Sequence, residues 1–157
     1  MMNRMNKLAV GAGALVLAVC AAAGAAAQGA AKPASAPHER IVEPKANASV
    51  TGTSVHVVLE AQGIEIAPAA EHKAGTAHHH LFLDTDVTPA DQPIPMGAPG
   101  IWHGGKGQTE YTFENVAPGQ HRLIAVLADP NHVPLSPMAA DTIRFTVKAP
   151  SAPSSNY

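Results

Sequence analysis

Alternating hydrophobic and polar residues mark several short stretches of the chain. Such alternation predicts β-strands that bury one face and expose the other. The stretches are residues 40–44, 54–61, 78–84, 109–116 and 141–148. Residues 121–128 are apolar on both faces, which predicts a central strand of a sheet.

Segments rich in Pro and Gly separate these stretches. The longest, residues 88–108, predicts an irregular loop, and because it contains Trp102 and His103 we expect it to be ordered and functional. Outside the first 27 residues, no stretch combines helical periodicity with capping residues. We therefore predict an all-β fold, an immunoglobulin-like β-sandwich of about seven strands.

Residues 1–27 have the three parts of a secretory signal peptide. Arg4 and Lys7 precede a twelve-residue apolar stretch, and Ala25 and Ala27 are small residues at the two positions that cleavage requires. The apolar stretch is too short to span a bilayer as a helix. We predict cleavage after Ala27 and export to the periplasm.

Cys20, the single cysteine of the chain, gives an alternative route. The residues before it resemble a lipoprotein signal, although the residue that precedes a lipidated cysteine is normally small and Val19 is not. A lipid anchor at Cys20 is therefore the alternative prediction, and the membrane is an expected partner only in that case. Cleavage after Ala27 would leave no cysteine for disulfides, thiolate ligands or nucleophilic catalysis.

The rest of the chain divides into three predicted parts. Residues 28–37 and 149–157 are rich in Ala, Pro and Ser, which predicts a disordered tether and tail around a sandwich domain at 38–148. After residue 27, eight Lys and Arg stand against twelve Asp and Glu, a formal charge of −4. No basic cluster is present, which argues against nucleic acid as a partner. We expect a monomer.

Three consecutive histidines open the stretch at 78–84. Because side chains alternate across a strand, His78 and His80 share one face, about 7 Å apart at their Cα atoms, within reach of one metal ion. His79 shares the opposite face with Leu81 and Leu83. That leucine-rich face is the predicted core face, so His79 is interpreted as a packed, hydrogen-bonded residue.

Three motifs resemble a known family. They are the triple-histidine strand within residues 75–84, the sequence Gly-Lys-Gly-Gln-Thr-Glu at 105–110 and an Ala-Asp-x-x-His loop at 128–132. In these motifs the chain is similar to the domain-of-unknown-function 4399 family of small secreted bacterial proteins, over roughly residues 74–147. It departs from that pattern at Gly104, where an aromatic residue often follows the histidine, and mildly after Leu81. The resemblance implies no particular activity.

The candidate metal site combines histidines from one strand and two loops. His132 follows the predicted central strand, in a loop stiffened by prolines. The predicted ligands are His78, His80 and His132, with His103 as a fourth or gating ligand. Further ligands or supporting residues are Asp129, Glu110, Gln108 and Lys106.

Ligand chemistry narrows the choice of ion. An all-imidazole set suits copper(II) or zinc(II) better than calcium, so the predicted cofactor is a copper or zinc ion. Because imidazole binds a metal only when neutral, we expect affinity to fall as the pH drops through roughly 6.5.

Two other interpretations of the histidines stay open at this point. They can be structural, bonding to loop backbone and orienting the Pro/Gly-rich loop, or the domain can bind a small ligand or partner in the cell envelope. An enzyme is the least supported class, since the chain has no serine-nucleophile motif and no phosphate-binding loop before a helix. A metal hydrolase with Glu110 as base would need an open coordination position.

Overall fold

A computed structural model describes residues 35–150 of the chain. The predicted signal peptide, the lipidation alternative at Cys20 and most of the predicted tether and tail lie outside the described residues. Nine strands and one short 3₁₀ helix make up the described part: β1 (His38–Glu43), β2 (Ser49–Thr51), β3 (Val55–Gln62), β4 (Glu65–Ile66), η1 (Ala69–Glu71), β5 (Thr76–Leu83), β6 (Ile101–His103), β7 (Glu110–Phe113), β8 (Gly119–Ala128) and β9 (Ala140–Lys148).

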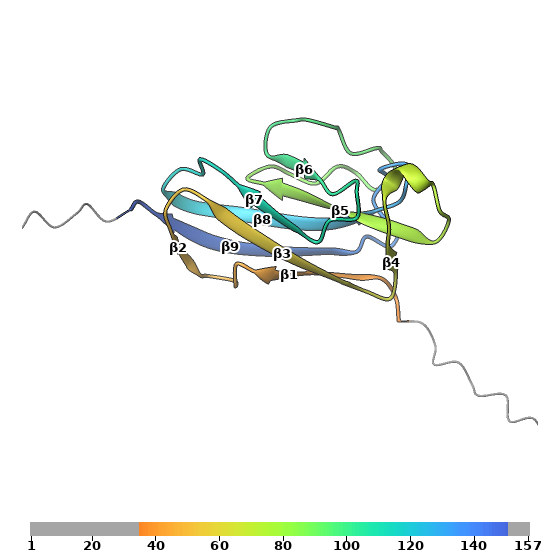
Figure 1. Ribbon diagram of the computed structural model, residues 1–157, viewed down its shortest axis with the longest axis horizontal. Coiled ribbons are helices and arrows are strands. Elements are labelled where there is room, and N and C mark those ends of the chain that lie inside the picture. The colour runs from red at the N-terminus through yellow and green to blue at the C-terminus, as the bar shows by residue number, and fades with distance from the viewer. Residues whose placement is uncertain (1–34, 151–157) are drawn as a thin grey trace, which may run out of the picture. The chain divides into compact units, whose positions relative to one another are not determined.

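The strands form two packed sheets (Figure 1). One sheet has the order β1-β3-β7, and the other has the order β2-β9-β8-β5-β4, with β6 paired to the free part of β5. Pairing is antiparallel except between β2 and β9 and between β4 and β5. The predicted all-β immunoglobulin-like sandwich is confirmed. No helix within residues 35–150 has the length and apolar character needed to cross a bilayer.

The five alternating stretches correspond to β1, β3, β5, β7 and β9, and the stretch that is apolar on both faces corresponds to β8. The prediction of about seven strands missed β2, β4 and β6, which are only two or three residues long and too short to show a period. One of the missed strands lies inside the loop predicted for residues 88–108, so that loop is not irregular throughout. β6 matters for function because it carries His103.

The main core lies between the two sheets. Val55, Val57 and Leu59 of β3 pack there with side chains of β8 and β9, as the alternation predicts. Burial of one such aliphatic side chain contributes about 1.5–3 kcal/mol. This core fixes which face of each strand points inward.

A second apolar cluster covers the opposite face of the larger sheet. Phe82 of β5 and Val126 of β8 pack there against Ile94, a residue of the long Pro/Gly-rich loop that is 2% exposed. The loop therefore closes over β5 and β8, and β5 is buried on both faces. The histidines of β5 that point away from the main core, His78 and His80, consequently lie in a second enclosed layer rather than in solvent.

His121, near the start of β8, lies in surroundings that favour its protonated form. Its Nδ1 lies 2.6 Å from Asp84 Oδ2 and its Nε2 lies 2.8 Å from the carbonyl oxygen of Ala117, so both ring nitrogens face acceptors. Burial lowers the pKa of His121, but the hydrogen bonds to Asp84 and Ala117 outweigh burial and raise it above 6.5. The backbone amide of Arg122 donates to the other carboxylate oxygen of Asp84.

We expect Asp84→Asn to destabilise the domain by about 1 kcal/mol or less below pH 6.5, because Asp84 is half exposed. Asparagine retains the acceptor for Arg122 and tolerates the left-handed backbone of residue 84 (φ 56°). A raised histidine pKa stabilises the fold below 6.5, and this contribution is lost as the pH rises through the raised value. Urea unfolding at pH 5.5 and 9 should thus show a deficit only at the lower pH, and an equal deficit at both would contradict the assignment.

Candidate metal centre

Three elements bring four histidines together on the loop-covered face of the larger sheet. His78 and His80 project from β5, and strand pairing places His103 of β6 directly beside His80. On the other side of β5, Ala128 ends β8 opposite His78, and the chain leaving it reaches His132 four residues later. The cluster defined by His78, His80, His103 and His132 is called the histidine cluster below.

The rings of the histidine cluster converge through their Nε2 atoms. His78 Nε2 lies 2.9 Å from His80 Nε2, and His103 Nε2 lies 3.1 Å from His132 Nε2. A metal ion bound tetrahedrally by imidazoles at about 2.0–2.1 Å requires nitrogens roughly 3.4 Å apart. The observed pairs need only a slight expansion to meet that requirement.

His78, His80 and His103 form the closest set. One ligand atom from each lies within 4.8 Å of the other two. The ring of His132 is 4.7 Å from the ring of His103 but 5.9 Å from that of His80, measured between centroids. The sequence suggested His132 as third ligand and His103 as fourth; in the structure His103 belongs to the closest set and His132 stands beside it.

Burial keeps the inner histidines neutral. His78 and His80 are fully buried, and that burial, together with neighbouring imidazoles, lowers the pKa of His78 to about 4 and the pKa of His80 to about 2. Burial and the charge of His132 also lower the pKa of His103. The inner rings are therefore in the form that binds metal throughout the neutral range.

We expect acid to destabilise the metal-free domain. A lowered histidine pKa means that the unfolded chain takes up protons first, so the contribution of His78 and His80 is complete above pH 6.5 and is lost as the pH falls toward 4. Each should cost about 2 kcal/mol between pH 6.5 and 4.5, at roughly 1.4 kcal/mol per pH unit. Glu39 and His121, whose pKa values are raised, act in the opposite direction and reduce the net loss.

Urea unfolding in the presence of a chelator at pH 7.0, 5.5 and 4.5 measures this loss. His56→Ala, which removes an exposed histidine of β3, should leave the slope with pH unchanged. A free energy of unfolding that stays level between pH 7.0 and 4.5 would contradict the assignment.

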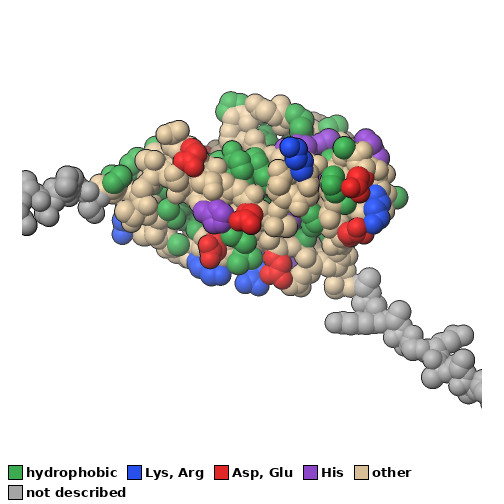
Figure 2. Space-filling view, in the orientation of Figure 1, with side chains coloured by type: hydrophobic (Ala, Val, Ile, Leu, Met, Phe, Trp, Pro, Cys, Tyr) green, Lys and Arg blue, Asp and Glu red, His purple; other side chains and the backbone are tan. Residues whose placement is uncertain are grey.

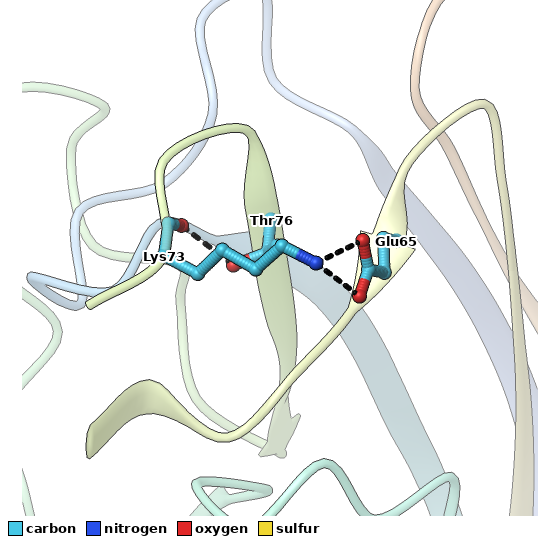
Figure 3. A network of polar contacts seen from close by, with 3 residues as sticks. All are labelled: Glu65, Lys73 and Thr76. Atoms are coloured by element: carbon cyan, nitrogen blue, oxygen red, sulfur yellow. Dashed lines mark hydrogen bonds and ion pairs between the residues drawn. The ribbon is translucent and has the colours of Figure 1, made fainter. Parts of the chain in front are cut away.

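The position of His78 on β5 is fixed by the segment that enters the strand. Thr76 Oγ1 donates to the carbonyl oxygen of Lys73 (2.8 Å), and Lys73 Nζ lies 2.7 Å from both carboxylate oxygens of Glu65 on β4 (Figure 3). Exposed ion pairs contribute little to the stability of a fold, so the main effect of this network is to position the segment before β5. It ties the start of β5 to the parallel strand β4 beside it.

Glycines make room for His103. A Cβ at residue 105 would lie 2.1 Å from Cε1 of the His103 ring, so any side chain there would displace the ring. At residue 104 a Cβ would lie 2.9 Å from the Trp102 ring, and the Gly104 amide donates to the carbonyl oxygen of His79. This crowding explains Gly104, where the family pattern often has an aromatic residue. Trp102 itself stacks on Tyr111 of β7, with centroids 4.7 Å apart, which anchors β6.

Asp129 builds the loop that presents His132. Its Oδ1 accepts the backbone N–H groups of Asn131 (2.8 Å) and Val133 (3.0 Å), and its carbonyl oxygen accepts the N–H of His132. His132 adopts the left-handed conformation (φ 67°), and its carbonyl oxygen accepts the N–H of Ile94. Asp129 is thus a positioning residue, and its charge also raises the pKa of His78, against the larger effect of burial.

The other residues suggested by the sequence lie apart from the histidine cluster. Glu110 is exposed on β7, in the other sheet, 3.5 Å from His56 Nε2. Gln108 accepts a hydrogen bond from the backbone N–H of Lys106, and both side chains are exposed. Within residues 35–150, no hydrogen bond or ion pair joins any of these three side chains to the histidine cluster.

The sequence patterns did not predict Glu39 as the buried partner of His79. His79 faces the main core as predicted, and there its Nδ1 lies 3.0 Å from Glu39 Oε2 of β1, with both side chains fully buried. Burial raises the pKa of Glu39, against the hydrogen bond from His79. The signal was present in β1, since Glu39 lies two residues before the inward-facing Ile41, but a glutamate is rarely assigned to a core.

The fold and the histidine cluster together define an immunoglobulin-like sandwich domain with a buried group of imidazoles under a loop. The chain belongs to the DUF4399 family, a domain of unknown function, which matches residues 57–148. This confirms the resemblance noted in the motifs.

Comparison with solved structures adds similarity in fold alone. Fibronectin(III)-like modules of Clostridium thermocellum CbhA are 15% identical, with a TM-score of 0.45 over 72% of this chain and 99% of the other. A CARDB domain from Pyrococcus furiosus, solved in complex with di-metal ions, is also 15% identical, with a TM-score of 0.36 over 74% and 94%. No curated protein matches the sequence.

Proposed function

We propose that this domain is an exported metal-binding module that holds one copper or zinc ion in the histidine cluster. The observation that carries the proposal is the convergence of ligand atoms from His78, His80 and His103 within 4.8 Å. The side chains come from two adjacent strands with a fourth imidazole beside them, and imidazole is a favoured ligand of both ions. The periplasm is the expected location, on the basis of the predicted signal peptide.

The second candidate is a structural or ligand-binding module of the cell envelope without a metal. The hydrogen-bonding distance between His103 and His132 favours it, because it links β6 to the loop after β8 without any ion. The metal-binding function and the function without a metal predict different results for metal binding, so one experiment separates them.

Equilibrium dialysis of the full chain, purified as the cell processes it, against copper(II) and zinc(II) at pH 7 tests the proposal. We expect one ion per chain, removed by a chelator, and a melting temperature raised by the ion. Because the pKa values of the inner histidines are lowered, binding should persist below pH 6.5, which revises the expectation from the sequence. Failure to bind either ion would leave the structural role as the better account.

A further inference from the structure

We infer that the metal centre is a three-histidine site with one coordination position open to a small anion. In this inference His132 is a fourth ligand that the anion can displace. This inference rests on the proposed function and goes beyond it, because it states what else binds the ion. Three protein ligands with an open fourth position are typical of sites that take up an external ligand, whereas four protein ligands close a site.

His132 lies close to His103, at 4.7 Å between ring centroids, and to His78, at 5.0 Å, but it lies apart from His80. His78, His80 and His103 share the closest set of ligand atoms. Of the six distances between ring centroids in the histidine cluster, the one from His132 to His80 is the longest, at 5.9 Å. An ion placed among the closest three would therefore meet His132 last.

Burial shows the side from which an external ligand can approach. His78 and His80 are fully buried, while His103 and His132 are partly exposed. Histidine side chains are visible at the molecular surface in Figure 2. His78 and His80 therefore form the buried side of the site, and His103 and His132 lie at its solvent side. From that side an external ligand can replace His132 without displacing His78 or His80.

The charge of the site favours an anion as that external ligand. Within residues 35–150, no carboxylate is hydrogen-bonded or ion-paired to any member of the histidine cluster. Asp129 is the acid whose charge acts on His78; its Oδ1 accepts two backbone N–H groups, and in the described part of the chain no hydrogen bond joins its carboxylate to the histidine cluster. Neutral imidazoles would leave a divalent ion with its full charge of 2+.

Apart from Asp129, the side chains beside the site in the strand register are apolar and would not offset that charge. Val126 lies beside His80 and Ala128 beside His78 in the register of β5 and β8, and both belong to the second apolar cluster. An uncompensated charge against apolar side chains is costly, so a monoanion bound to the ion would stabilise it directly. The chemistry that fits is a small monoanion with a ligating oxygen or nitrogen, such as a carboxylate.

Copper(II)-loaded full chain titrated with azide tests the inference. We expect a saturable azide-to-copper charge-transfer band, and acetate should compete with azide for the same position. His132→Asn should weaken copper binding less than His103→Asn does and should still bind azide, since asparagine adopts the left-handed conformation of residue 132. His103→Asn should weaken copper binding at least tenfold. Melting curves of the metal-free variants check that each is folded.

The possible outcomes are distinct. A copper-loaded protein that gives no azide band would overturn the open position while leaving the proposed function intact. An azide band combined with an equal loss of copper affinity in both variants would make His132 a permanent ligand and overturn the three-histidine assignment. A wild-type protein that binds neither copper nor zinc would overturn the proposed function, and this inference with it.

Discussion

Replacing His80 by Ala is expected to lower copper or zinc affinity at least 100-fold, the largest effect of any single substitution in the domain. His80 is fully buried, its Nε2 lies 2.9 Å from that of His78, and its strand neighbour across the pairing is His103. It therefore contacts both other members of the closest set. Its removal leaves only His78 and His103 of the closest set, so the ion loses a fully buried ligand. Isothermal titration calorimetry at pH 7 measures the change.

The matched controls are histidines outside the cluster. His56 is exposed on β3, in the other sheet, and His72 lies in the loop before β5. Both contribute imidazole to any diffuse surface chelation, so His56→Ala and His72→Ala should leave affinity within about twofold. If either control weakens binding as much as His80→Ala, the protein chelates metal without a defined site.

His80→Ala has a second readout that does not need metal. The variant lacks the group whose pKa is lowered to about 2, so its metal-free form should lose less stability than the wild type between pH 6.5 and 4.5. An unchanged slope would mean that His80 is not held neutral by burial.

Replacing Glu39 by Leu is expected to destabilise the domain by about 1–3 kcal/mol, because it leaves the buried Nδ1 of His79 without its partner. Glu39 and His79 connect β1 to β5 across the main core, so the loss affects both sheets. Glu39→Gln keeps an acceptor for His79 and should cost less. Urea unfolding at pH 7 measures all these variants.

A double variant separates the partnership from simple packing. Replacing both Glu39 and His79 by Leu should recover much of the loss, since a buried pair is often matched by apolar residues of similar size. Glu60→Ala, which breaks an exposed pair with Arg40, should cost less than about 1 kcal/mol. A double variant as unstable as the sum of its single variants would show that the pair is not a coupled unit.

Sequence patterns predicted the sandwich because its six longer strands each bury a regular face. They also predicted that His78 and His80 share a face, since that follows from the geometry of a strand alone. They did not predict β6, because three residues show no period and its pairing with β5 is a tertiary contact. No sequence pattern therefore indicated that His103 lies closer to His80 than His132 does.

Loop residues were predicted less well for a related reason. The sequence Gly-Lys-Gly-Gln-Thr-Glu suggested that Lys106, Gln108 and Glu110 serve the site, but two of its glycines have other uses. Gly105 makes room for the His103 ring, and Gly107 adopts the left-handed conformation (φ 77°) that turns the chain toward β7. Glu39 was overlooked because burial of a glutamate depends on a partner forty residues away.

β5 is enclosed on both faces and carries the same side chain at three successive positions. In most strands a one-residue slip exchanges polar for apolar side chains and is strongly penalised. At residues 78–80 a slip would still offer a histidine to Glu39, so these three positions barely distinguish correct from shifted pairing. Alignment of the strand then depends on Leu81 and Phe82, which differ in size and belong to different apolar clusters. An ion met by the chain before those two residues are packed would find competing histidine arrangements, whereas the finished domain offers it one.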